Sequence, residues 1–180
     1  DMAARASAYL ARAADGRTVP PADALRLGRG VAALYVGGEP GWVLAIRHVE
    51  GIAGPRAERV RARASYHLGR FHDAVAAYDR LLAEWPEDPR AWWERAMARF
   101  GVATMAGGAG QDARPLFRAA VADYDQAIDR EDGPRPRLNR GAAYYALAQV
   151  ESARGEDPLP SLAAARGDFD ESVQLDPTDL

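Results

Sequence analysis

The sequence predicts an all-α fold in which antiparallel helix pairs stack into a solenoid. Ala, Leu, Arg and Glu dominate the periodic segments, and all four residue types are good helix formers. No segment sustains the two-residue alternation that is typical of a half-buried strand. Gly or Pro interrupts the chain at short intervals, and the segments between the interruptions have the length of ordinary helices.

The interruptions define the expected helices in order. They carry Gly or Pro at residues 20–21, 37–38, 54–55, 69, 86, 107–108, 133–134 and 155–160. Proline cannot continue the hydrogen-bond ladder of a helix, so these positions separate helices. We therefore expect helices at residues 2–14, 22–36, 41–53, 56–69, 72–85, 90–105, 112–131, 135–153 and 158–175.

An internal repeat connects these helices. Arg followed by a small residue recurs in the expected first helices, at Arg29–Gly30, Arg61–Ala62, Arg95–Ala96 and Arg140–Gly141. An aromatic residue with a small residue four positions before it recurs in the expected second helices, at Tyr78, Tyr124 and Phe169. A single helix pair cannot bury its apolar face, so such units must stack and share one continuous core.

The later two units carry the same insertion at the same place. Ala62 and Ala74 are 12 residues apart, whereas the corresponding residues of the next two units are 24 apart. The extra residues fall at the junction of the first and second helix. We expect longer first helices that project as a ridge in these two units, and a mobile loop at the Gly-rich segment 107–110.

The segment ARASYHLGRFHDAVAAYDRLLAEWPEDP resembles the tetratricopeptide repeat, and LNRGAAYYALA and DFDESVQLDP extend the resemblance over residues 56–180. The signature places are filled by Ala62, Gly69, Phe71, Ala74, Tyr78 and Pro86. Glu58, Arg61 and Ser65 depart from the larger apolar residues that are common in the family. The resemblance implies a partial helix of a truncated or capping unit at 1–21, a degenerate repeat at 22–54, a repeat at 55–89, and repeats with an insertion at 90–133 and 134–180.

The composition excludes several kinds of chemistry. The chain has no Cys, which excludes disulfides, thiolate zinc sites and cysteine nucleophiles. It has no Lys, which excludes a phosphate-loop lysine and a Schiff-base lysine. The net charge of −3 does not suggest nucleic-acid binding, and no apolar run approaches the roughly 20 residues that span a bilayer. We expect no cofactor, no metal, no nucleic acid and no membrane as partners, and a cytoplasmic location.

The most suggestive catalytic pattern is His72–Asp73, which a hydrolase could use as a general base with its partner. The competing interpretation is that the pair caps the start of a helix just after the Gly69 turn, and we favour it. The acidic pairs Asp123/Asp125 and Asp168/Asp170 flank packing aromatics, so we interpret them as a solvated face. The prediction is therefore a protein without enzymatic activity.

The resemblance to the repeat family implies a concave groove that is lined mainly by first helices and binds a peptide or partner protein. Arg and aromatic residues anchor many binding sites, and Arg grips carboxylates with two hydrogen bonds, so an acidic peptide fits. The alternative is that the arginines are solvated and that Trp92, Trp93 and Phe100 belong to the core. The groove-facing places fall on Arg56, Arg59, Arg63, Tyr66, Arg90, Trp93, Met97, Phe100, Arg135, Leu138, Asn139 and Tyr145.

A second hypothesis makes the chain a regulatory or oligomerising appendage of a larger enzyme. Its insertions are similar to those of repeats attached to bacterial serine/threonine kinases, and this version predicts self-association. The chain begins at Asp1 and not at an initiator Met, which suggests a piece of a longer protein. Trp85 is unusual for its place in the repeat, and we expect it either to pack against Trp92 or to await a partner.

Overall fold

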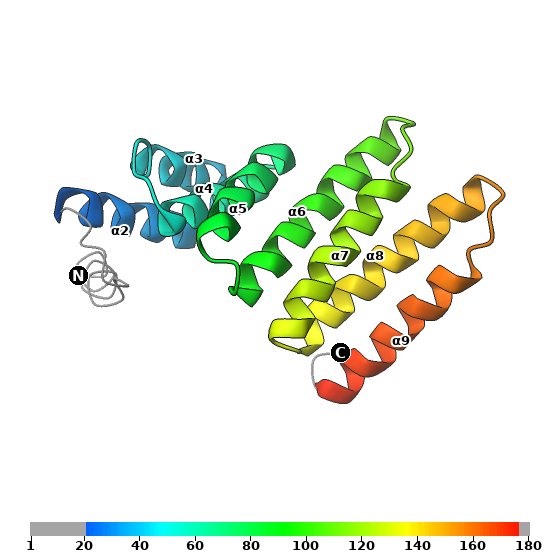
Figure 1. Cartoon of the computed structure of the whole chain (residues 1–180). Helices are drawn as coiled ribbons and strands as arrows, with labels where there is room; N and C mark the ends of the chain where they lie inside the picture. Colours follow the sequence, from blue (N-terminus) through cyan, green and yellow to red (C-terminus); the bar gives the residue numbers. More distant parts are fainter. Residues whose placement is uncertain (1–20, 177–180) are drawn as a thin grey trace. The chain divides into compact units, whose positions relative to one another are not determined.

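The computed structural model describes residues 21–176, and every regular element in that range is a helix (Figure 1). The predicted all-α class is therefore confirmed, and the predicted helix at 2–14 lies outside the described residues. The helices are α2 (Pro21–Val36), α3 (Gly38–His48), α4 (Pro55–His67), α5 (Phe71–Glu84), α6 (Pro89–Gly108), α7 (Arg114–Arg130), α8 (Pro134–Ala153) and α9 (Leu159–Leu175).

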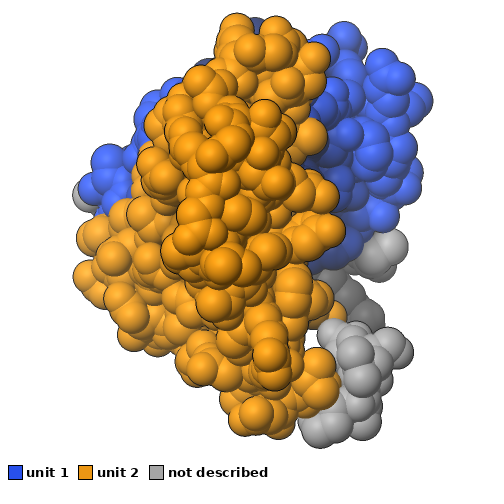
Figure 2. Space-filling model, turned by 90° about the vertical axis from the view of Figure 1, so that its right-hand side faces the viewer, with its two compact units in different colours: residues 1–85 blue, residues 86–180 orange. Residues whose placement is uncertain are grey.

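The chain divides into two compact units, residues 1–85 and 86–180 (Figure 2). In the first unit α2 packs on α3 and α4 packs on α5, while α4 also contacts α2 and α3. In the second unit α6 packs on α7 and α8 packs on α9, while α8 also contacts α6 and α7. Each unit thus consists of two helix pairs whose first helices touch.

The first unit has a core of small and branched side chains. Leu27, Ala45, Val49 and Val60 are almost completely buried and form one cluster. Gly30 makes this packing possible, because a Cβ atom at that position would lie 2.9 Å from a methyl group of Val49. The small residue of the repeated Arg-small pattern is therefore required where α2 meets its neighbours.

The second unit has a similar design, and its two helix pairs repeat each other at a spacing of 45 residues, as between Tyr124 and Phe169. Its core contains Ala96, Ala120 and Tyr124, and Tyr124 is 2% exposed. In the last pair the aromatic is Phe169, and a Cβ atom at Gly141 would lie 2.7 Å from its ring. The sequence predicted this role for the small residues and the aromatics, and the structure confirms it.

The predicted elongation of the first helices is also confirmed. The first helix grows from 13 residues in α4 to 20 in α6 and α8, and the second grows from 14 in α5 to 17 in α7 and α9. The predicted loop at 107–110 is wrong in its position. Gly107 and Gly108 belong to α6, and the turn to α7 comprises residues 109–113. Glycine tolerates a helix interior at modest cost, and Ala106 remains buried there.

The predicted helix at 41–53 is displaced. α3 begins at Gly38, because Pro40 lies in the first turn, where a missing N–H breaks no intrahelical bond. The helix ends at His48, and Gly51 then takes a positive φ of 73°. This turn returns Ile52, which is 5% exposed, to the core.

Candidate protein-interaction surface

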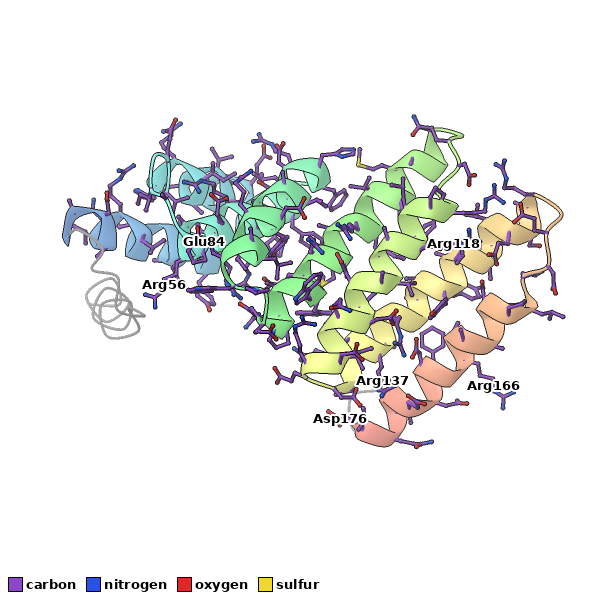
Figure 3. The ribbon with its side chains drawn as sticks, in the orientation of Figure 1. Arg56, Glu84, Arg118, Arg137, Arg166 and Asp176 are labelled. Atoms are coloured by element: carbon purple, nitrogen blue, oxygen red, sulfur yellow. The ribbon has the colours of Figure 1, made fainter. Side chains whose placement is uncertain are left out.

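The predicted groove residues of the first unit all lie on α4 and are half-buried: Arg56, Arg59, Arg63 and Tyr66. Tyr66 is tied into the packing of α4 on α5, because its ring lies 5.6 Å from the ring of Phe71. Burial raises the pKa of the Tyr66 hydroxyl. Figure 3 shows the Arg56 side chain extending away from the ribbon of α4.

The predicted groove residues on α6 belong partly to the core. Trp93, Met97 and Phe100 are half-buried and pack against the cluster of α6, α7 and α8. Phe100 meets Phe117 edge-on, with ring centroids 5.3 Å apart. The Trp93 indole N–H is buried and has no hydrogen-bond acceptor. These side chains therefore combine a packing role with a surface that solvent still reaches.

Arg90, at the start of α6, is exposed and donates through Nε to Glu94, at 3.1 Å. Its side chain remains 57% exposed despite this contact. Glu94 is itself 7% exposed, so the negative charge next to Arg90 lies below the surface of the helix. The first turn of α6 consequently presents a cation to solvent.

A continuous exposed row runs along α8. Successive members are three or four residues apart, so they share one helical face. Leu138 is 47% exposed and Tyr145 is 50% exposed, whereas Asn139, beside the row, is half-buried. The row contains no carboxylate, and its members are Arg135, Leu138, Ala142, Tyr145 and Gln149.

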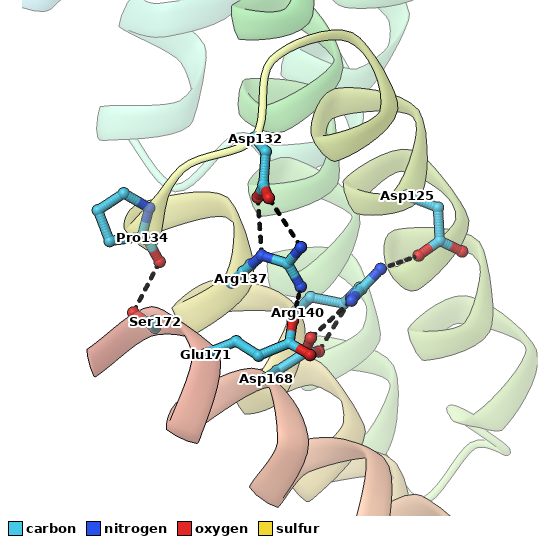
Figure 4. Close-up of polar contacts among 8 residues, drawn as sticks. All are labelled: Asp125, Asp132, Pro134, Arg137, Arg140, Asp168, Glu171 and Ser172. Atoms are coloured by element: carbon cyan, nitrogen blue, oxygen red, sulfur yellow. Dashed lines mark hydrogen bonds and ion pairs between the residues drawn. The ribbon is translucent and has the colours of Figure 1, made fainter. Parts of the chain in front are cut away.

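Two buried ion pairs, which the sequence interpretation missed, join the helices of each pair in the second unit. Arg95 donates to Asp123 through Nε at 2.8 Å and Nη2 at 2.7 Å. Arg140 donates to Asp168 in the same way, at 2.9 and 2.6 Å (Figure 4). In both cases the partners are 28 residues apart.

The interpretation of Asp123 and Asp168 as a solvated face is therefore wrong. Asp123 is 2% exposed and Asp168 is 4% exposed. Each precedes a packing aromatic and points between the helices at the arginine of the Arg-small pattern. Asp125 also has a partner, because Arg140 donates to it through Nη1 at 2.6 Å. A repeated Arg and a repeated Asp at constant separation were the signal that could have revealed these pairs.

Arg140 links three helices. Arg140 belongs to α8 and donates hydrogen bonds to Asp168 of α9 and to Asp125 of α7 (Figure 4). The hydrogen bonds that Arg140 donates to Asp168, and to a lesser extent the one that it donates to Asp125, raise the pKa of its guanidinium. These contacts thus connect α8 both to α9 and to α7 of the preceding helix pair.

A second arginine strengthens the same end of the stack. Arg137 donates to Asp132 through Nε at 2.7 Å and also binds Glu171 (Figure 4). The Arg137 hydrogen bonds lower the pKa of the Asp132 carboxyl. The Ser172 hydroxyl donates to the Pro134 carbonyl at 2.9 Å. These contacts fix the start of α8 against the end of α9.

The first unit uses a different partner at the same place. Arg61 donates to the Val49 carbonyl at 2.6 Å and also to the Ile52 carbonyl. It reaches Glu58 of its own helix at 2.6 Å, and Glu58 binds Arg80 at 2.9 Å. The unusual residues of this repeat therefore satisfy the backbone of the turn after α3.

His72 and Asp73 are both exposed in the first turn of α5. The prediction that they cap this helix is wrong, because the N-cap residue is Arg70 and no side chain caps it. Asp73 contributes only a carboxylate near the helix N-terminus, where negative charge is favourable.

Trp85 and Trp92, on the two sides of the turn between α5 and α6, have different surroundings. Trp85 is half-buried at the end of α5. The Trp92 indole N–H donates to the Pro86 carbonyl at 2.6 Å. The guanidinium carbon of Arg95 lies 4.5 Å from the centroid of the Trp92 ring, and that of Arg130 lies 5.2 Å from it. Trp92 thereby fastens the chain before α6 to the first pair of the second unit.

Comparisons with known proteins agree with this architecture. Residues 55–100 match the family model of the tetratricopeptide repeat. A solved chain titled MamA MSR-1 C2 is similar, with a TM-score of 0.58 and 16% sequence identity, and the match covers 99% of this chain and 89% of that chain. No curated protein matches the sequence. Among the described helices, none has the length and apolar character needed to cross a bilayer. The fold is thus a tetratricopeptide-like α-solenoid, as predicted.

Proposed function

We propose that this tetratricopeptide-repeat protein is a non-catalytic scaffold that binds a peptide or a partner protein through its first helices. The observation that supports the proposal most directly is the exposed row on α8. A row of Leu138, Ala142 and Tyr145 on a helix whose opposite side is buried offers apolar area for contact. Exposed aromatic and apolar groups of this kind are typical of binding surfaces.

The contact between α6 and α8 extends this surface. The half-buried Trp93, Met97 and Phe100 of α6 adjoin the cluster that includes Ala143 of α8. Rigid aromatic side chains already held by core packing lose little conformational freedom when a ligand binds. The surface would therefore be preorganised for an apolar segment of a partner.

Charge suggests the second property of the ligand. Arg90 and Arg135 are exposed on the first turns of α6 and α8, and the exposed row on α8 has no acid. An arginine in that setting binds a carboxylate with two parallel hydrogen bonds. The favoured ligand is a segment with apolar side chains followed or preceded by acidic ones.

A peptide-display experiment tests the proposal. A randomised peptide library is selected on the folded chain, and the recovered peptides are titrated by fluorescence anisotropy. We expect enrichment of acidic and aromatic or aliphatic residues. Tyr145→Ser and Arg135→Glu should weaken binding of the selected peptides at least about tenfold, which is the scale of one lost anchor.

Matched controls separate local from general effects. Tyr35→Ser removes a tyrosine that is 77% exposed on α2, and Arg70→Glu reverses an exposed charge outside the first helices. Both should leave the affinity unchanged. Peptides that bind the Tyr145 and Arg135 variants as well as the parent chain would refute this location for the site.

A further inference from the structure

Within residues 21–176 no helix covers the outward face of α9, and this face carries both apolar and charged groups. Among the helices that the structure describes, α9 packs against α8 alone. Leu162, Arg166, Asp170 and Val173 follow at spacings of three or four residues and share one face. Leu162 is 38% and Val173 41% exposed, and Figure 3 shows Arg166 pointing away from the helix pair.

The order of residues along this face is nearly symmetric about its centre. An apolar residue lies at each end, and two opposite charges lie between them, with Arg166 nearer the N-terminus and Asp170 nearer the C-terminus. Within one chain these two form an i,i+4 ion pair at 3.5 Å, and their side chains stay 85% and 62% exposed. In a copy of the helix that runs in the opposite direction, the aspartate therefore occupies the place of the arginine and the arginine that of the aspartate.

Such a face complements itself in an antiparallel arrangement. When two identical helices are related by a twofold axis at the level of residue 168, position 166 of one copy lies opposite position 170 of the other. Arg166 then meets Asp170 of the second copy twice, once on each side of the axis. Ala163 and Val173 become opposed in the same way, and Leu162 lies opposite Gln174 of the second copy.

The edge of this face also allows close approach. Gly167 is exposed, and a Cβ atom built there would have nothing within 4 Å. A residue without a side chain at the edge of the crossing removes bulk that would separate two helices. A shared patch of this kind is what an isologous interface requires, because the same surface serves both subunits.

We propose that α9 mediates self-association of this protein, with a second copy packing antiparallel on the outward face of α9. The occupant is inferred from charge complementarity: a like-oriented copy would oppose equal charges, whereas the antiparallel copy opposes unlike ones. This inference is independent of the binding surface on α6 and α8. We expect one helix face to bury less than about 1,200 Å², the lower limit of a standard interface, so the dimer is weak and concentration-dependent.

Charge reversal tests the proposed register on the complete chain. Sedimentation velocity over a concentration series should show reversible dimer formation by the parent protein. Arg166→Asp and Asp170→Arg each place like charges opposite one another across the twofold axis, and each should weaken dimerisation at least about tenfold. The double variant Arg166→Asp/Asp170→Arg restores both pairs and should dimerise like the parent.

Mixing the two single variants gives the sharpest result. In a mixed dimer the carboxylate introduced at position 166 faces the arginine introduced at position 170, and the native Arg166 faces the native Asp170. An equimolar mixture should therefore dimerise although neither variant does so alone. Asp129→Arg changes an exposed charge on α7 and serves as the control, with no expected effect.

Two outcomes would overturn the proposal. A parent chain that stays monomeric up to about 1 mM does not associate in any useful range. Dimers that form equally well in both single variants use another surface. Circular dichroism of every variant shows whether a loss of association reflects a loss of folding, and recovery in the mixture excludes that explanation directly.

Discussion

Arg140 holds Asp168 by two parallel hydrogen bonds at 2.9 and 2.6 Å, and Asp168 is 4% exposed. The pair joins α8 and α9, the two helices of the last repeat. Because Arg95 and Asp123 form the same pair 45 residues earlier, the ion pair is common to both repeats of the second unit.

Asp168→Ala should destabilise the protein strongly. Removing one partner leaves the guanidinium of Arg140 in a partly buried site without its main acceptor, at a cost of about 3 kcal/mol. Asp125→Ala removes the more exposed acceptor of the same arginine and should cost about 1 kcal/mol or less. Urea unfolding monitored by circular dichroism measures both, and equal losses would contradict the assignment of Asp168 as the main partner.

Replacing both partners should recover much of this loss. In Arg140→Met/Asp168→Leu no buried charge is left unpaired, and apolar side chains of similar size fill the site, which is often neutral or stabilising. The unfolding free energy of the double variant should lie closer to that of the parent than to that of Asp168→Ala. A double variant as unstable as the single one would show that the pair also has a packing role that Met and Leu do not meet.

Gly141→Ala and Gly167→Ala should have opposite effects on stability. A Cβ atom at Gly141 would lie 2.7 Å from the Phe169 ring and 3.1 Å from the Ala165 carbonyl, so α8 and α9 must move apart, at about 1–3 kcal/mol. A Cβ atom at Gly167 meets nothing, so alanine there should stabilise α9 by roughly 0.5–1 kcal/mol. Thermal unfolding measures both shifts.

A compensating change checks the cause of the loss at Gly141. Phe169→Leu shortens the side chain that the added methyl group would strike, so Gly141→Ala should cost less in that background than alone. Additive losses would contradict a direct clash between positions 141 and 169.

The sequence predicted the helix pairs and the packing aromatics because both follow from local rules. Tyr124 and Phe169 recur with small residues at fixed spacing, and burial of such a set needs no knowledge of distant partners. The ion pairs were missed because a charged residue next to a buried one was assumed to point outward. Asp123 can be buried because two distant arginines, Arg95 and Arg99, neutralise it.

The C-terminal boundary of α6 escaped prediction for a related reason. Gly107 and Gly108 are poor helix formers, but they follow a helix already held by the packing of Val102, Ala103 and Ala106. Tertiary contacts therefore carried α6 through a segment whose local preference was for a turn. For the proposed binding surface, the repeat resemblance pointed to Leu138 and Tyr145, which are exposed. The alternative that Trp93 and Phe100 belong to the core agrees with their packing against the buried cluster.

Acid should destabilise the parent protein more than it destabilises the Asp132→Asn variant. Arg137 lowers the pKa of Asp132 below its ordinary value of 3.8, so the folded state binds this proton less readily than the unfolded chain. The contribution of the pair is complete above the ordinary pKa and is lost as the pH falls through the folded-state pKa. The Asp132 side chain is 45% exposed, so protonating it should lower the unfolding free energy by less than about 1 kcal/mol.

Urea unfolding at neutral pH and at about pH 3 gives the required comparison, since this interval crosses the titration of an ordinary carboxyl group. The parent should lose more stability than the variant between the two conditions. The variant carries no titrating group at position 132, so an equal loss in both proteins would assign the acid sensitivity to other carboxylates.

Two neighbouring tryptophans should respond differently to the same substitution. Trp93→Phe deletes a buried N–H that has no acceptor, which offsets part of the packing lost with the smaller ring, so the cost should be below about 1 kcal/mol. Trp92→Phe deletes a hydrogen bond of 2.6 Å to Pro86 and weakens the contact with Arg95, at about 1–2 kcal/mol. Equilibrium unfolding of the two variants decides the order. A larger loss at Trp93 would mean that the Trp93 ring serves mainly the core. The proposed binding surface on α6 would then lack its largest aromatic contact.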